Sequence, residues 1–354
     1  MDQEFKKNNF DLLRLIAATQ VVLSHSIAHL GIARPWWWGV VTAFPGVPVF
    51  FAISGFLISA AYERSSNLRR YFENRVLRIY PGLWCCLLVT VLVTVLFGYR
   101  AAIGQGFLWM TAQAVGLIYT PAFLASFGFG SYNGSLWTIP IELQFYALLP
   151  LLYFASRKLK NPTGGFLSAC VVFLFVAYAA TRLFEPLAEI DREPIAQKLL
   201  RYSFIPHFYL FLFGVIMQRC GIYRRPWVGG RGVYWITAYL MFYAFVPIEP
   251  ATHVIASILL SVAVVSCAFS APNLSDWLLR SNDISYGVYI YHGLLLNVLV
   301  EIGIRGRLAV LPLILGITYG VAYLSWILVE RPCLRRKRAS IHALPNSRMS
   351  TYTN

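Results

Sequence analysis

The first apolar segment of the chain, residues 10–31, carries two residue types that can do chemistry inside a membrane. Arg14 supplies a permanent cation, and His25 supplies an imidazole that can exchange a proton near neutral pH. A helix turns once every ~3.6 residues, so a separation of eleven residues places both side chains on one face, ~16 Å apart along the axis. This pattern indicates an anionic group bound at one depth and a proton transfer at another. In the structural alternative, Arg14 reaches lipid headgroups and His25 makes a hydrogen bond.

A carboxylate follows in SLWTIPIELQFY, residues 135–146. Glu142 is expected about two turns inside an apolar segment, at a depth similar to that of His25. Because a buried carboxylate needs a partner, we expect Glu142 to orient the His25 ring and to stabilise its imidazolium. The alternatives are an arginine partner or a structural water pocket.

A basic segment, NLRRYFENRVLRIYPGLW (67–84), precedes a further apolar run. Arg75 and Arg78 are three residues apart on one helical face, and Arg69 and Arg70 lie one to two turns earlier. Guanidinium forks bind phosphates well. Attraction to anionic lipid explains such a segment equally well, so the residues alone leave both interpretations open.

A second polar patch lies in ISYGVYIYHGLL, residues 284–295. Tyr289 and His292, three residues apart, share a helical face in the predicted inner half of the membrane, well separated in depth from His25. The alternative is an aromatic belt with one structural histidine. His25 and His29 form an H-x3-H pair, but no thiol or carboxylate cluster joins them, so we expect no metal site.

These side chains must be positioned by membrane helices. The composition is 58% apolar and 13% charged, and the mean hydropathy is +0.60, which excludes an ordinary soluble domain. We predict an all-α, polytopic membrane protein, because ten apolar runs approach the ~20 residues of a membrane span. The segment 106–119 either enters the membrane or lies at its interface. The ten predicted spans are about 10–31, 43–62, 79–98, 135–155, 164–182, 201–218, 232–248, 252–271, 284–303 and 308–329.

Membrane topology explains the net charge of +15 better than a nucleic-acid partner does. If the N-terminus is cytoplasmic and the spans alternate, most of the 30 Lys and Arg residues fall in inner loops, as the positive-inside rule requires. Both termini are then cytoplasmic. We expect one membrane domain, residues 1–335, followed by a disordered cytoplasmic tail, residues 336–354.

In order along the chain, R-x10-H, FFAISGFLIS, NRVLRIYPGLW, SLWTIPIEL, ISYGVYIYHG and a terminal VERP resemble acyltransferase family 3. Its members are membrane proteins that acylate carbohydrates. The resemblance implies that Arg14 and His25 are the first-span Arg and catalytic His of the family, and that Arg75 and Arg78 serve the acyl-CoA side. It also matches Glu142 to the acidic residue after the SLW motif, and Tyr289 and His292 to the ninth-span Tyr/His motif.

The expected reaction is transfer of an acyl group, most simply acetyl, from cytoplasmic acyl-CoA to a sugar hydroxyl of the cell envelope. The CoA phosphates would meet Arg75 and Arg78, with Arg69 or Arg70 helping, and the pantetheine arm would pass Arg14 and His292. His25 would act as general base or carry the acyl group covalently. The resemblance implies a bacterial inner-membrane enzyme with membrane lipids and a carbohydrate acceptor as partners. A secondary transporter or lipid-linked sugar flippase is the rival class, and the oligomeric state is left open.

Overall fold

The computed structural model describes residues 7–64, 67–183, 194–247 and 249–335. Every regular element within those residues is a helix, as predicted for the fold class. The predicted tail, residues 336–354, lies outside the described residues, so its disorder stays a prediction.

Seven helical stretches among the described residues are long and apolar enough to cross a membrane. Each overlaps a span predicted from the sequence, and together they make the chain an integral, multi-pass membrane protein. The stretches contain α2 (Phe10–His29), α4 (Gly46–Arg64), α5 (Leu68–Leu96), α7 (Thr138–Ser156), α8 (Pro162–Thr181), α12 (Pro250–Ala268) and α15 (Val310–Ser325), which continues as the π-helical turn η5 (Trp326–Glu330).

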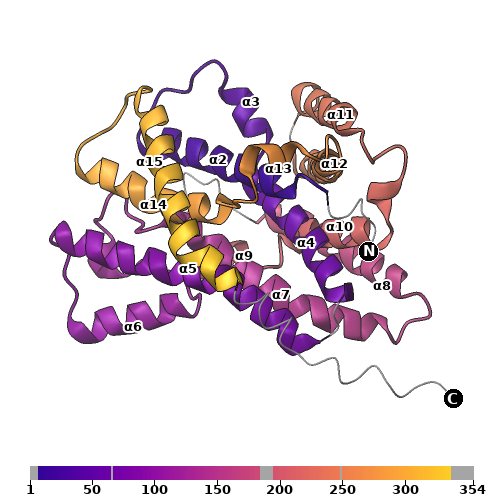
Figure 1. Cartoon of the computed structure of the whole chain (residues 1–354), viewed down its shortest axis with the longest axis horizontal. Coiled ribbons are helices and arrows are strands. Elements are labelled where there is room, and N and C mark those ends of the chain that lie inside the picture. Colours follow the sequence, from indigo (N-terminus) through magenta and orange to yellow (C-terminus); the bar gives the residue numbers. More distant parts are fainter. Residues whose placement is uncertain (1–6, 65–66, 184–193, 248, 336–354) are drawn as a thin grey trace.

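Three further predicted spans are shorter helices: α10 (Phe208–Arg219), α11 (Gly232–Phe245) and α14 (Ser285–Glu301). With a rise of ~1.5 Å per residue, the 12 residues of α10 extend about 18 Å, less than the ~30 Å hydrocarbon core. The count of ten spans and the side of the termini therefore remain predictions. The ambiguous segment 106–119 overlaps α6 (Ile103–Ala114), which lies beside α5 (Figure 1). The other short elements are α3 (Trp38–Ala43), α9 (Ile195–Arg201), α13 (Leu274–Leu279), η1 (Ala122–Leu124), η2 (Gly134–Trp137) and η4 (Ile222–Arg224).

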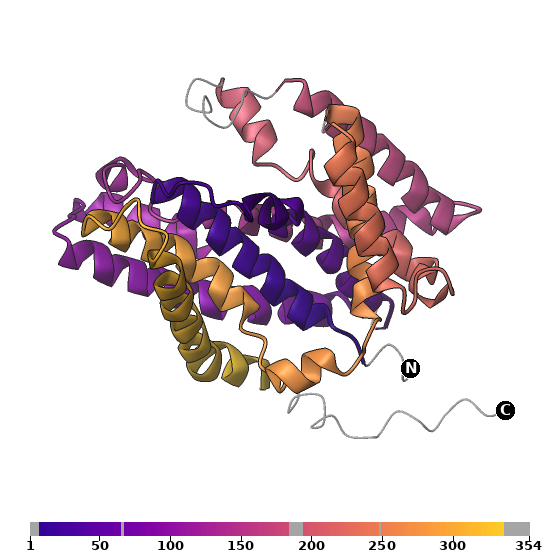
Figure 2. The same ribbon diagram turned by 90° about the horizontal axis from the view of Figure 1, so that it is seen from above.

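Helix α4 lies between two groups of helices. On one side it packs against α2, which contacts α14, and α14 contacts α15. On the other side it packs against α10 and α12, which contact α8 and α11. Both views show this arrangement, with α14 and α15 next to α2 and with α8, α11 and α12 at the opposite end (Figures 1 and 2).

The contact between α4 and α10 depends on two glycines. A Cβ at Gly55 would strike the backbone of Phe211, and a Cβ at Gly214 would strike the backbone carbonyl of Ala52. Small residues of this kind allow membrane helices to approach backbone to backbone. Helix packing therefore explains the glycines at positions 55 and 214.

Helix α5 joins the basic segment to the third predicted span. It is one continuous helix of 29 residues with Pro81 inside it. Pro81 lacks the N–H that would bond the carbonyl of Leu77, and the rest of the ladder carries the helix through. The arginines of residues 69–78 are thus on the same helix as the span.

Candidate active site

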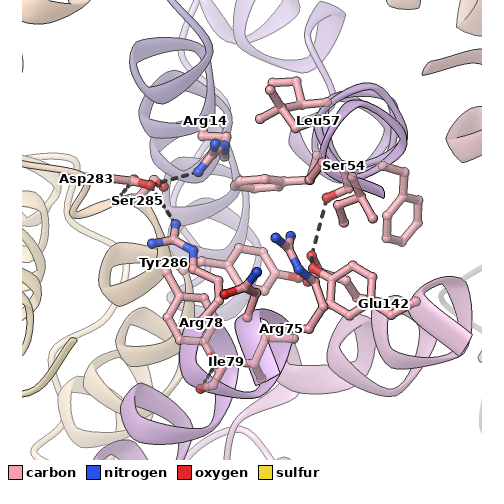
Figure 3. A pocket seen from close by; sticks show the side chains of 18 of the residues that line it. Arg14, Ser54, Leu57, Arg75, Arg78, Ile79, Glu142, Asp283, Ser285 and Tyr286 are labelled. Carbon is pink, nitrogen blue, oxygen red and sulfur yellow. Dashed lines mark hydrogen bonds and ion pairs between the residues drawn. The ribbon is translucent and has the colours of Figure 1, made fainter. Parts of the chain in front are cut away.

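A pocket of about 560 Å³ opens among α2, α4, α5, α7 and the start of α14. Helix α4 lines it on every turn from Val47 to Arg64, a length of ~26 Å along the helix axis. This length is comparable to the ~30 Å thickness of a hydrocarbon core. Its lining includes five arginines against three carboxylates, which favours an anionic ligand (Figure 3). The predicted site residues that line the pocket are Arg14, Arg70, Arg75, Arg78, Glu142 and Tyr289.

Arg75 points into this pocket from α5 (Figure 3). Its guanidinium lies 5.7 Å from the ring centroid of Tyr146. Among the described residues Arg75 has no ion pair, and its Nε atom is buried without a hydrogen-bond partner. A buried unpaired donor is costly, and an anion beside Arg75 would supply the partner that its Nε atom lacks among the described residues.

Arg14 and Arg78 are held by Asp283, a residue that the sequence interpretation missed. The Asp283 Oδ2 atom accepts from Arg14 Nη1 at 2.8 Å and from Arg78 Nη2 at 2.6 Å. Its Oδ1 atom accepts from the Ser285 hydroxyl at 2.5 Å. The acidic residue two positions before Ser285, where α14 begins, was the available signal, because Asp and Ser are typical of helix starts. This cluster joins α2, α5 and α14 (Figure 3).

The Asp283 carboxylate stays ionised in this environment. Burial alone would raise its pKa, but Arg78, Arg14 and the Ser285 hydrogen bonds oppose burial and lower the pKa to about 2. Arg14 also pairs with Asp11 at 3.2 Å. The cluster is therefore charged at physiological pH.

Glu142 does not contact His25, which corrects the expected pair. Its Oε1 atom accepts from the hydroxyls of Tyr146 and Ser54, the latter at 3.3 Å. The position of α7 explains this result. Its contact with α14 is made by Thr138, whose hydroxyl lies 2.8 Å from the Tyr289 hydroxyl. Glu142 is one turn further along the same face and therefore points at α4 and α5.

His25 instead meets His292, with 3.0 Å between His25 Nδ1 and His292 Nε2. The expectation that these histidines lie at different depths is therefore wrong. Helix α14 runs beside α2, and its start is already level with Arg14, because Asp283 bonds that residue. About two turns of α14, from Ser285 to His292, then bring the His292 ring to the level of His25. Arg14 and His25, predicted to share a face, both point at α14.

Tyr289 connects the pocket to the histidine pair. It lines the pocket, and its ring centroid lies 5.9 Å from that of His292. His25 and His292 themselves are not among the lining residues. Arg69 is placed elsewhere: its side chain is 89% exposed and pairs with Glu73 at 2.8 Å. Within the described residues no group of three or more His, Cys, Asp or Glu could hold a metal ion.

The site combines three chemical features, from the arginine-rich end of the pocket to the histidine pair beyond Tyr289. An arginine-rich end suits phosphates, a passage lined by α4 suits a long substrate arm, and a histidine pair beyond Tyr289 suits proton transfer.

Comparison with known proteins gives the family. A family model described as an acyltransferase domain matches residues 7–329. The chain is 31% identical to nodulation protein 10 of Rhizobium leguminosarum bv. viciae over 95% of both chains. It is 27% identical to an O-acetyl transferase of Shigella phage Sf6, covering 94% of this chain and 97% of that protein. It is 26% identical to the exopolysaccharide production protein ExoZ of Rhizobium meliloti (strain 1021), covering 83% of this chain and 90% of that protein. No solved structure matches the chain.

Proposed function

The chain belongs to acyltransferase family 3, and we propose that it transfers an acyl group, most simply acetyl, from cytoplasmic acyl-CoA to a hydroxyl of an exported carbohydrate. The name of the phage relative supports transfer to oxygen, and the ExoZ name supports a polysaccharide acceptor. Membership of this family favours acyl transfer over the transporter alternative. We place the protein in a bacterial inner membrane, where acyl-CoA and exported glycans lie on opposite sides.

One observation carries this proposal: the pocket joins an arginine-rich end to Tyr289, the neighbour of the histidine pair. An acyl-CoA donor needs both ends. Its phosphates require cations, and its thioester must reach a base some distance away. A pocket lined by α4 from Arg64 to Val47 provides that distance inside one passage.

At the arginine-rich end, Arg75 is proposed to bind a CoA phosphate directly, with Arg70 beside it on α5. Both side chains line the pocket, and Arg75 Nε lacks a partner among the described residues. Arg14 and Arg78 contribute positive potential while Asp283 holds them in place. Arg69, which is exposed and paired with Glu73, is not proposed as a ligand.

Glu142 is proposed to shape the wall of the pocket. It accepts a hydrogen bond from the Tyr146 hydroxyl, and the Tyr146 ring faces Arg75. The carboxylate therefore fixes the aromatic surface against which the Arg75 guanidinium lies. A role as the direct partner of His25 is not part of this proposal.

At the other end, His25 is proposed as the general base. Its imidazole takes the proton of the acceptor hydroxyl as the oxygen attacks the thioester carbonyl carbon. The carbon–sulfur bond breaks, and the CoA thiolate receives the proton back from the imidazolium. The acceptor gains the acyl ester, and CoA leaves as the thiol.

The test uses membrane vesicles from cells that express the full chain, supplied with acetyl-CoA labelled in the acetyl group. Base-labile label in the glycan fraction is expected with the wild type, and His25→Ala should reduce it at least ~100-fold, the usual scale of general-base catalysis. His253→Ala is the matched control, because His253 is an exposed histidine of α12. Unchanged labelling with His25→Ala in a protein that still inserts would contradict the proposal.

A further inference from the structure

The histidine pair has a defined direction of hydrogen bonding. His292 Nδ1 lies 3.3 Å from the carbonyl oxygen of Val288, one turn earlier on α14. Its Nε2 atom lies 3.0 Å from His25 Nδ1. His292 is fully buried, so these two contacts account for both of its ring nitrogens.

The Val288 carbonyl determines the tautomer of both rings. A carbonyl oxygen only accepts hydrogen bonds, so His292 Nδ1 must carry a proton. A neutral imidazole has one N–H, and His292 Nε2 is therefore an acceptor. The proton in the second contact then belongs to His25 Nδ1. It follows that the Nε2 atom of His25 carries the free lone pair, and none of the described residues hydrogen-bonds that atom.

Contacts around α14 fix the position of that helix and so keep His292 beside His25. Next to it, Gly293 has no room for a Cβ, because the side chain of Asn133 occupies the space. Asn133 Nδ2 donates to the Ile290 carbonyl at 2.7 Å. One turn later, Asn297 Nδ2 donates to the carbonyl of Ser131 at 2.8 Å. The loop before η2 thus fixes α14 from the outer-loop side, and Asp283 fixes its start.

We infer that His292 is a positioning residue that, through the Val288 carbonyl, holds His25 in the tautomer whose Nε2 atom is the base. The role rests on the proposed function of His25. When His25 Nε2 takes the acceptor proton, the imidazolium keeps its Nδ1–H bonded to His292 Nε2. The accepting nitrogen of His292 stabilises that charge where a carboxylate would do so in other histidine bases. His292 neither touches the acyl donor nor loses its own proton in this step.

The test compares two replacements of His292 in the same acetyl-CoA labelling assay. His292→Phe keeps a ring but removes the acceptor, whereas His292→Gln places a carbonyl oxygen near the position of Nε2. We expect His292→Phe to lower kcat ~100-fold with the KM for acetyl-CoA unchanged within twofold. His292→Gln should recover at least tenfold of that loss. Thermal stabilisation by acetyl-CoA, measured for both variants in detergent, shows that each is folded and binds the donor.

Each outcome either supports or overturns the positioning role of His292. A fall in kcat with Phe that Gln rescues, at constant KM, supports the positioning role. Equal losses for Phe and Gln, or no loss for Phe, overturn it. A raised KM with unchanged kcat also overturns it, because His292 would then be a donor contact. Absence of labelling with the wild type would instead contradict the proposed function itself, so the two failures are distinguishable.

Discussion

Arg75 and Arg78 lie three residues apart on α5, yet their side chains have different partners. Arg78 donates to Asp283 at 2.6 Å, so its charge is already compensated. Arg75 faces the Tyr146 ring and has a buried Nε without a partner among the described residues. The R-x-x-R pattern therefore contains one arginine paired with a carboxylate and one with no ion pair among the described residues, a difference that spacing alone does not reveal.

Replacement of Arg75 by Ala should weaken donor binding without unfolding the protein. A charge-assisted hydrogen bond contributes ~1.5–3 kcal/mol, so we expect the KM for acetyl-CoA to rise ~10–100-fold with little change in kcat. Arg69→Ala is the matched control, because Arg69 is exposed on the same helix and pairs with Glu73. Equal effects of the two variants on KM would assign Arg75 to lipid attraction instead.

Asp283 should be important for stability. Asp283→Asn leaves Arg14 and Arg78 without their shared carboxylate, and breaking such a pair by removing one partner costs about 3 kcal/mol. We expect a clear fall in the thermal midpoint of the detergent-solubilised protein. Asp276→Asn on α13 is the control. A midpoint equal to that of the wild type would show that the cluster is not stabilising.

The low pKa of Asp283 gives this stabilisation a pH window. The folded-state pKa is about 2, below the ~3.9 of a free aspartate. Because the folded-state value is depressed, the stabilisation is fully present above the unfolded pKa and disappears as pH falls through the folded pKa. Between pH 5 and 8, Asp283 should therefore add no pH dependence to the midpoint, and the loss in Asp283→Asn should be constant across that range.

At the scale of helices, periodicity predicted which side chains share a helical face but not which residues that face contacts. Arg14 and His25 do share a face, and that face packs on α14. Their partners Asp283 and His292 were not predicted, because periodicity carries no information on where a helix starts in depth. Because Asp283, just before α14, is level with Arg14, it is His292 and not Glu142 that meets His25. Helix–helix register is set by long-range contacts that a single sequence does not display.

The crossing of α4 and α10 should tolerate no side chain at its centre. A Cβ at Gly214 meets the Ala52 carbonyl and the Phe56 backbone nitrogen, and neither can move without shifting a helix. Overpacking of this kind costs ~1–3 kcal/mol or more, so Gly214→Ala should lower the thermal midpoint and the yield of folded protein. Gly320→Ala on α15 is the matched control, since a Cβ there meets nothing within 4 Å. Comparable midpoints for the two variants would contradict the close contact.

At the scale of the whole molecule, the charge distribution and the pocket lining agree on which end of the pocket is predicted to be cytoplasmic. The positive-inside pattern predicts that the start of α5 and the end of α4 lie in the cytoplasm, and Arg64, Arg70 and Arg75 line that part of the pocket. The histidine pair lies further along α2 and α14, toward the predicted outer side. Donor and acceptor would therefore reach the reaction from opposite faces of the membrane.

Sidedness of the donor site follows from this arrangement and is directly measurable. Acetyl-CoA carries several charges and does not cross a lipid bilayer, because moving charge into hydrocarbon is prohibitively costly. Sealed inside-out vesicles, which expose the cytoplasmic face, should therefore incorporate label from added acetyl-CoA, whereas sealed right-side-out vesicles should incorporate almost none until detergent opens them. Arg75→Ala should lose the inside-out signal at low acetyl-CoA and regain it at high acetyl-CoA, which ties the sidedness to this pocket. Label entering intact right-side-out vesicles at the same rate would place the arginine-rich end outside. The predicted topology, and with it the direction of acyl transfer, would then have to be reversed.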